Sequence, residues 1–158
     1  MNLKRLSNKE LRILSKEISN YGFPVKKGDE VYSTILEGLK IYIINKKVGF
    51  FCFKEKIVPS LHIMLENKNI LDLMKKIFVD KGAIIAVVKG ADVMRPGIVS
   101  FSDDLKRGDV VAILDENNKQ VLAIGEMLFN SEEIKGMNSG RIAKNIHHYN
   151  DKIWNFKI

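Results

Sequence analysis

The sequence of 158 residues contains little of what several classes of protein depend on. It has one cysteine, three histidines, three prolines and one tryptophan. A single cysteine excludes an intramolecular disulfide and any zinc site built from several cysteines. Cys52 lies in the apolar run at 48–53, where a buried strand position is the simplest interpretation. We therefore expect a protein of the reducing cytoplasm, without a metal or a cofactor.

Long apolar runs are also missing. Residues 1–17 carry charges that interrupt every apolar stretch, so they lack the continuous apolar core of a signal peptide. The longest apolar runs, such as the one at 83–88, are far shorter than the roughly 20 residues that a membrane-spanning helix needs. The sequence thus predicts a soluble, cytoplasmic protein with no membrane partner.

Motifs for nucleotide cofactors and for catalysis are absent as well. The chain has neither a GxGxxG loop nor a GxxxxGKS/T loop. His62 has no carboxylate or cysteine at a spacing typical of a catalytic site, and Ser60, two residues before it, completes no hydrolase arrangement. We therefore predict that the protein is not an enzyme.

Basic residues, by contrast, are in excess. The chain has 26 Lys and Arg against 19 Asp and Glu, which gives a net charge of +7 and a pI of about 9.4. Such an excess favours an anionic partner such as RNA, DNA or a membrane surface. Residues 1–72 carry 13 basic and 8 acidic groups, and residues 73–158 carry 13 and 11. We expect the more basic first half to contribute its own phosphate contacts, from a face that includes Lys46, Lys47, Lys54 and Lys56.

The first half reads as a small α/β unit over residues 1–72. A helix is predicted over 8–20, because Ser7 and Glu10 have the spacing of a capping box and an apolar face follows them. Runs rich in Val, Ile, Tyr and Phe then predict a meander of three strands, at 30–37, 39–44 and 48–53. A short helix begun by Ser60 completes the unit.

The second half, residues 73–158, has frequent glycines and short strand-like runs, which favour a small closed β structure. Two helices fit between the strands. One follows Asp80, with residues 83–88 as a fully buried face, and the other follows Ser131. The predicted strands lie at 97–101, 109–115, 120–129 and 153–156.

Three segments of this half resemble a known family. The run VDKGAIIAVVKGADVMRPGI (79–98) resembles the signature of PUA domains, RNA-binding modules named after pseudouridine synthases and archaeosine transglycosylases. Residues 108–113 and 121–134 resemble the central strand of that domain and the strand and helix after it. The end, NSGRIAKNIHHYNDKIW (138–154), resembles more specifically the malignant T-cell-amplified sequence family, the translation machinery-associated proteins.

That resemblance implies an α+β protein with two domains. Members of the family carry a small α/β pre-PUA domain, here residues 1–72, before a PUA pseudo-barrel, here residues 73–158. The match is strong over about half of the chain and weaker over the first half, which is shorter than in eukaryotic members.

Two glycine-containing bends form the candidate RNA site. Asp80 can cap a helix whose free amides suit a phosphate, and Gly82 leaves the backbone open there. The resemblance points to the same place, because PUA domains bind RNA at the first helix, the following strand and the last strand. We predict a groove with small residues on its floor and cations on its rim, formed by Lys81, Gly82, Lys89, Gly90, Ala91, Arg95, Pro96, Gly97 and His147. The alternative is that the glycines only serve tight turns and the cations are solvated.

Residues next to the candidate RNA site are assigned mainly to packing and turns. Asp92 is expected to cap or orient the second bend. Met94 is expected to lie in the core, and the alternative is that it packs on a base or ribose. His147 and His148 are adjacent, so in a strand one packs inside while the other is able to contact RNA. Packing or plain exposure is the commoner role for such histidines.

The function predicted from these features is RNA binding in translation. By resemblance, the partners are tRNA at its acceptor end or small-subunit rRNA, the small ribosomal subunit and a translation initiation factor. One alternative is a protein-interaction module that docks a translation factor, with the PUA domain as scaffold. Another is an accessory subunit of an RNA-modification enzyme, because residues 1–72 are too few for a catalytic domain of that kind.

Overall fold

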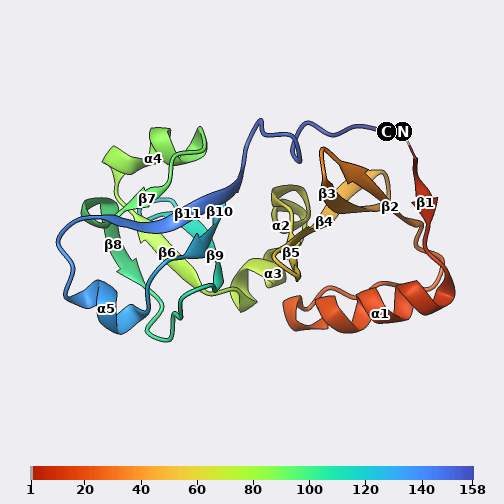
Figure 1. Cartoon of the computed structure of the whole chain (residues 1–158), viewed down its shortest axis with the longest axis horizontal. Helices are drawn as coiled ribbons and strands as arrows, with labels where there is room; N and C mark the ends of the chain where they lie inside the picture. The colour runs from red at the N-terminus through yellow and green to blue at the C-terminus, as the bar shows by residue number, and fades with distance from the viewer. Residues whose placement is uncertain (1) are drawn as a thin grey trace. The chain divides into compact units, whose positions relative to one another are not determined.

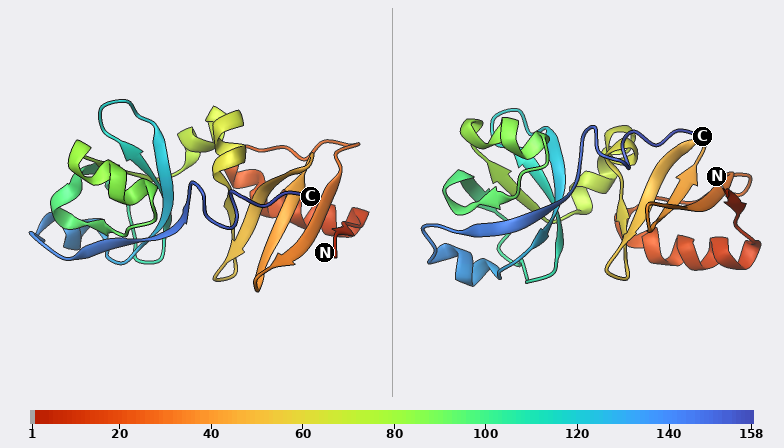
Figure 2. Two further views of the ribbon diagram at one scale, coloured as in Figure 1. Left: turned by 90° about the horizontal axis from the view of Figure 1, so that it is seen from above. Right: turned by 45° about the horizontal axis from the view of Figure 1, so that its top comes forward.

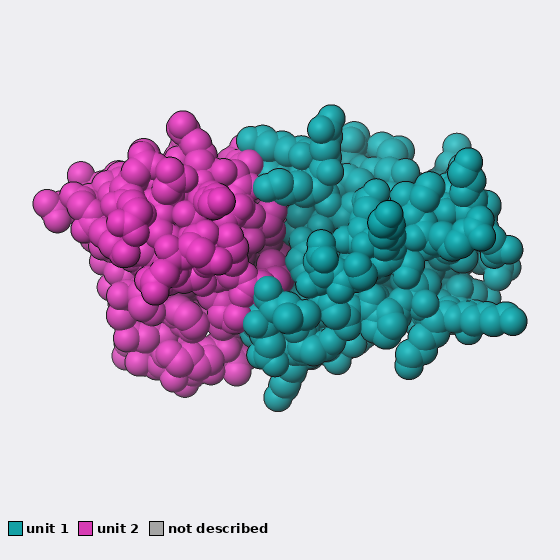
Figure 3. Space-filling model, turned by 90° about the horizontal axis from the view of Figure 1, so that it is seen from below, with its two compact units in different colours: residues 1–73, 152–158 teal, residues 74–151 magenta. Residues whose placement is uncertain are grey.

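The computed structural model describes residues 2–158, and the chain forms two compact units (Figure 3). Unit 1 consists of residues 1–73 together with 152–158, and unit 2 of residues 74–151. The last seven residues therefore belong to the unit that begins the chain. None of the helices in the described part is long and apolar enough to cross a membrane.

Unit 1 is an antiparallel sheet with three helical segments (Figures 1 and 2). Its strands follow one another in sequence order: β1 (Lys4–Arg5), β2 (Val31–Leu36), β3 (Leu39–Ile44), β4 (Lys47–Phe53) and β5 (Lys56–Pro59). The longest helix is α1 (Asn8–Ile18), which continues into the short 3-10 helix η1 (Ser19–Tyr21). After the sheet come α2 (Leu61–Glu66) and α3 (Lys68–Leu73). The predicted α/β content of the first half is confirmed.

The start of α1 is fixed as the sequence predicts. The Ser7 hydroxyl accepts a hydrogen bond from the Glu10 amide at 3.2 Å, and the Glu10 carboxylate accepts one from the Ser7 amide at 3.3 Å. This reciprocal pair satisfies two amides that the helix itself leaves without partners. Leu14 and Ile18 are buried on the inner face of the helix. The same capping principle applies at α2, where the Ser60 hydroxyl accepts from the Ile63 amide.

Three two-residue loops connect β2 to β5. Both loop residues have positive φ in each case, as the primed turns that suit twisted hairpins require: Glu37–Gly38, Asn45–Lys46 and Lys54–Glu55. Gly38 and Asn45 adopt this conformation readily. Lys54 and Glu55, at φ 46° and 65°, are strained by it. The sheet of unit 1 therefore has one turn made entirely of residues that disfavour its geometry.

Unit 2 is built on a curved, six-stranded sheet. Its elements run β6 (Lys76–Val79), α4 (Lys81–Val88), β7 (Val93–Met94), η2 (Arg95–Gly97), β8 (Ile98–Phe101), β9 (Val110–Asp115), β10 (Val121–Met127), α5 (Ser131–Lys135) and β11 (Arg141–His148). The strand order is β7–β11–β10–β9–β6–β8. The pair β6–β9 is parallel and the others are antiparallel. The core inside this sheet includes Ile77, Val111, Ile113, Leu122 and Ile142.

Several sequence-based predictions about elements need correction or addition. Residues 153–156 form turns and irregular structure and not a strand, because the backbone turns at Asn150 (φ 66°) and the segment packs on unit 1. The predicted strand ranges did not include β1, β5, β6, β7 or β11. Pro59 suggested a turn, yet it ends an edge strand, where the missing amide of proline removes no bond to a further strand.

The run at 83–88 of α4 does not form a fully buried face, contrary to the prediction. Val87 is buried, and Ala83, Ile84 and Val88 pack against the core. Ile85, however, is 70% exposed. The continuous apolar run at 83–88 forms a helix with one buried and one exposed face. At 3.6 residues per turn, only about half of its positions face inward.

Candidate nucleic-acid interface

The first predicted bend is closed by Asp80, at the start of α4. Its carboxylate accepts a hydrogen bond from the Ala83 amide at 3.1 Å, and its own amide donates to the Gly97 carbonyl at 2.9 Å. A side-chain carboxylate therefore already caps this helix start and places a negative charge there. Phosphate contacts at this helix are better made by neighbouring cations than by its amides.

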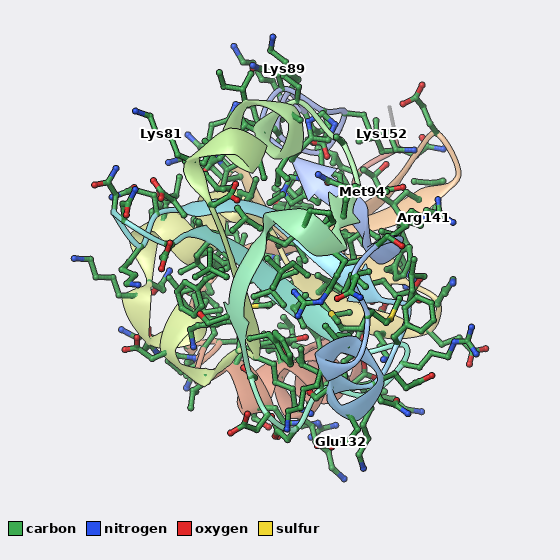
Figure 4. The ribbon with its side chains drawn as sticks, turned by 90° about the vertical axis from the view of Figure 1, so that its left-hand side faces the viewer. Lys81, Lys89, Met94, Glu132, Arg141 and Lys152 are labelled. Carbon is green, nitrogen blue, oxygen red and sulfur yellow. The ribbon has the colours of Figure 1, made fainter. Side chains whose placement is uncertain are left out.

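The exposed face of α4 carries two such cations. Lys81, Ile85 and Lys89 follow at intervals of four residues, which places them in one row about 6 Å apart. All three are exposed, and Figure 4 shows Lys81 and Lys89 projecting away from the helix. We name these three residues the α4 row. It offers two positive groups on either side of an apolar contact.

The predicted glycines have different roles. Gly82 is exposed, and a Cβ added to it would meet only the Asp80 carboxylate, at an ordinary 3.4 Å. At Gly97, a Cβ would lie 3.1 Å from that of Ala83, so this glycine lets η2 approach α4. At Gly90 the backbone has φ 106°, and a Cβ would lie 2.7 Å from the His148 ring. Gly97 and Gly90 thus serve packing, and only Gly82 opens the backbone to solvent.

Asp92 orients the second bend, as predicted. Its carboxylate accepts a hydrogen bond from the Asn145 amide at 2.8 Å and one from the Arg141 guanidinium at 3.1 Å. The side-chain amide of Asn145 in turn donates to the carbonyls of Val87 and Ala91. The end of α4 and the exposed Ala91 are therefore tied to β11.

Arg95 does not lie on the rim of a groove. Its Nε donates to the Ile134 carbonyl at 3.0 Å, and its Nη1 lies 3.4 Å from the Ile98 carbonyl. The guanidinium also lies over the Phe101 ring, 5.8 Å from the centroid. The partly buried side chain of Arg95 holds α5 to β8, so its guanidinium stabilises the fold of unit 2. The adjoining Pro96 is exposed.

The predicted site residue His147 lies in the interior of unit 2. Its side chain is fully buried, and its Nδ1 donates to the Asp151 carboxylate at 2.7 Å. His148 is the partly exposed neighbour, and its ring rests on Gly90. The two do face opposite sides of β11, as adjacent strand residues must. Their order could not be read from the sequence, because either register gives the same pattern.

Two exposed residues outside the predicted site lie on the strands β7 and β11, and Figure 4 shows them on the face of unit 2 that carries α4. Met94 was expected in the core but is 50% exposed. Arg141 is exposed and lies opposite Met94 in the β7–β11 pair. Arg141 also pairs with Asp92, which links it to the second bend. We name the α4 row, Ala91, Met94 and Arg141 together the PUA face. In the sequence, the exposure of Arg141 was indicated only by the alternation of inward-facing and outward-facing residues along β11.

The basic face predicted in the first half is divided by the structure. Lys46 and Lys47 lie at the start of β4, whereas Lys54 and Lys56 lie beyond its other end. A strand of this length separates the two pairs by roughly 20 Å. Lys47 forms an ion pair with Glu66. These four lysines therefore do not form one continuous patch.

Charge is divided between the units even more unevenly than between the halves of the sequence. Unit 1 holds 15 basic and 8 acidic residues, a net +7, because it includes Lys152 and Lys157. Unit 2 holds 11 basic and 11 acidic residues, a net charge of zero. Within residues 2–158 there is no cluster of His, Cys, Asp and Glu that could hold a metal ion.

Comparisons with known proteins agree with this architecture. The model of the PUA domain matches residues 75–149, which lie within unit 2. Translation machinery-associated protein 20 of Saccharomyces cerevisiae is 35% identical over 126 residues, 76% of this chain and 68% of the yeast protein. The crystal structure of a hypothetical protein from Pyrococcus horikoshii superposes with a TM-score of 0.79 at 32% identity, over 97% of this chain and 98% of that one.

A more distant structure is that of an H/ACA RNP bound to a substrate RNA. It is 25% identical with a TM-score of 0.50, over 65% of this chain and 30% of that one. The curved sheet of unit 2 is thus the predicted PUA pseudo-barrel, preceded by a pre-PUA fold in unit 1. The chain belongs to the family of PUA-domain proteins that includes translation machinery-associated protein 20 and malignant T-cell-amplified sequence 1.

Proposed function

We propose that this protein is a non-catalytic RNA-binding factor of the translation machinery and that RNA contacts the PUA face of unit 2. The observation that supports this most directly is the α4 row, with Lys81 and Lys89 on either side of the 70% exposed Ile85. The lysines suit phosphates and the apolar side chain suits a ribose or a base. Exposed Met94 extends the apolar contact.

The proposed targets are the acceptor end of tRNA or a segment of small-subunit rRNA. An RNA end or loop with unstacked bases suits this face better than a continuous duplex. The few apolar side chains of the PUA face are flanked by cations, and only unstacked bases are free to pack on them. The proposed protein partners are the small ribosomal subunit and a translation initiation factor. The names of the yeast and vertebrate relatives support the link with translation.

No catalytic role is proposed. The His147 ring, which pairs with the Asp151 carboxylate, is fully buried and holds the end of β11. A buried ring of this kind is out of reach of a polynucleotide. The charged groups that define the PUA face are the cations Lys81, Lys89 and Arg141, which suit phosphate.

The test is a double variant, Lys81→Ala with Lys89→Ala. Affinity for tRNA and for small-subunit rRNA fragments is measured by fluorescence anisotropy across a range of salt. We expect affinity to fall by about tenfold and the slope of log affinity against log salt to fall by about two. The matched control is Lys106→Ala with Arg107→Ala, which removes two exposed cations of unit 2 away from the PUA face. Equal losses in both variants, or none in the first, would contradict the proposal.

A second candidate function is supported by the zero net charge of unit 2 and by its exposed Ile85 and Met94. These features also suit docking of a protein translation factor. Binding of that kind depends on apolar burial, so it should weaken little as salt rises. An Ile85→Ser variant that loses a translation factor but keeps its affinity for RNA would favour this second role.

A further inference from the structure

The last residues of the chain build an aromatic site on unit 1. The indole ring of Trp154 stacks on the imidazole of His62, with ring centroids 3.9 Å apart and planes within 10°. The His62 Nε2 donates to the Trp154 carbonyl at 2.9 Å. Both the ring and the backbone of Trp154 are therefore fixed. This explains why the segment at 153–156 departs from the expected strand.

A cleft of about 710 Å³ lies beside this stack. Its volume is within the range of sites that hold small organic ligands. It is lined by the aromatic residues Tyr32, Trp154 and Phe156 and by three cations, Lys46, Lys47 and Lys157. All of these residues belong to unit 1. None of them belongs to the PUA face.

The charges around the cleft indicate which kind of ligand it favours. Lys46 and Lys157 are exposed, whereas Lys47 is paired with Glu66. One carboxylate, that of Glu30, lines the cleft. The unit as a whole carries a net +7. An anionic ligand with a flat apolar part satisfies both the lysines and the aromatic walls, whereas an apolar peptide would leave the cations unused.

We propose that this cleft holds an unpaired nucleotide of single-stranded RNA, with its base against the aromatic walls and its phosphates beside Lys46 and Lys157. Aromatic surfaces next to cations are how proteins bind single strands without reading their sequence. Base stacking on aromatic side chains contributes about 1–3 kcal/mol per base. The site would be a second RNA contact, independent of the PUA face proposed above.

Trp154 makes the proposal directly measurable, because it is the only tryptophan of the chain. Its fluorescence is followed while the full-length protein is titrated with a single-stranded uridine octamer. We expect saturable quenching, and we expect the affinity to fall as salt rises. An octamer of abasic sugar–phosphate should bind more weakly and should not quench, because it has no base to stack.

Variants separate this cleft from other surfaces. Lys46→Ala with Lys157→Ala should weaken octamer binding by about tenfold and lower the salt slope by about two. Tyr32→Leu, which keeps an apolar side chain but removes the ring, should weaken it without altering the salt slope. The matched control is Lys26→Ala with Lys27→Ala, two exposed lysines of unit 1 that do not line the cleft.

The outcomes also distinguish this site from the PUA face. Quenching that persists in the Lys81→Ala, Lys89→Ala variant supports an independent cleft, even if that variant loses tRNA. Absence of quenching overturns the proposal and leaves the PUA face unaffected. Losses that are the same in the Lys26→Ala, Lys27→Ala control also overturn it, because they would show general attraction to charge. Salt-insensitive quenching by an apolar peptide but not by the octamer would identify a protein site instead.

Discussion

The two units divide between them the properties that an RNA-binding protein needs. Unit 2 carries the motif of the PUA family but has no net charge, whereas unit 1 carries the whole net +7. Net charge supplies long-range attraction to a polyanion, and a shaped surface supplies position and register. The difference suggests that unit 1 contributes most of the salt-dependent attraction and that unit 2 contributes the shaped contact.

The units also differ in how their sheets are made. In unit 1 each strand pairs with its neighbour in sequence, and the strands β2 to β5 form successive hairpins. Unit 2 joins distant segments, since β6 pairs with β9 in parallel and β7 pairs with β11. Glycines allow close approach in unit 2, as at Gly90 and Gly97, and residues with positive φ connect successive strands of unit 1.

The largest effect is expected at Gly90. Gly90→Ala would place a side chain at φ 106°, with its Cβ 2.7 Å from the His148 ring. Backbone strain and overpacking together should lower the free energy of unfolding by about 3 kcal/mol. Urea unfolding followed by circular dichroism measures this. Gly82→Ala, an exposed glycine in the same helix–turn segment, is the control and should be neutral or stabilising by up to about 1 kcal/mol. An equal loss in both variants would show that close packing is not the reason for Gly90.

The next effect concerns the end of unit 2. Asp151 accepts hydrogen bonds from the His147 ring and from the His148 amide. Asp151→Ala would leave the fully buried His147 ring without this acceptor, so we expect unfolding free energy to fall by about 2 kcal/mol. The control is Asp103→Ala, an exposed carboxylate of the same unit, which should change stability little. Equal stability of the two variants would contradict the structural role assigned to Asp151.

Much of unit 1 was predictable because its signals are local. The Ser7–Glu10 capping box and the breaks at Gly38 and Asn45 each depend on residues close in sequence. In unit 2 the helix after Asp80 was located for the same reason, and the helix predicted after Ser131 begins at Ser131 itself. The strand order was not predictable from the sequence pattern, because the residues of β6 or β9 alone do not show that these two strands pair.

The candidate site was only partly predictable, and the reason is again physical. A sequence shows that Lys81, Lys89 and Arg95 are cations, but not which of them folds back onto carbonyls. Arg95 does so, and its long side chain reaches two backbone oxygens inside unit 2. Met94 was assigned to the core by its chemistry, although its strand is only two residues long and leaves it half exposed.

Stability at alkaline pH should depend on a buried tyrosine in each unit. Burial, together with the neighbouring Cys52 thiol, raises the pKa of Tyr42 in unit 1 to about 12. The folded state keeps the phenol protonated while the unfolded chain ionises near its usual pKa of about 10, so stability falls as pH rises from about 10 to 12. Tyr42→Phe should flatten this part of the profile, measured as the urea midpoint against pH. Burial also raises the pKa of Tyr149 in unit 2, so Tyr149→Phe is the matched comparison. If Tyr42→Phe keeps the same alkaline slope as the parent, that phenol is not the source.

The smallest effect tests the turns of unit 1. Lys54 and Glu55 both have positive φ, and neither is a residue that favours it. Glu55→Gly would remove the steric conflict of a side chain in this region without changing the turn, so we expect a gain of about 1 kcal/mol in unfolding free energy. Glu17→Gly is the matched control, because it makes the same substitution at an exposed position of α1, where glycine should destabilise by about 1 kcal/mol. Opposite signs at the two sites would show that the β4–β5 turn is held by the pairing of its strands against the preference of its own residues. A loss at both sites would instead mean that the Glu55 side chain makes contacts that outweigh its backbone strain.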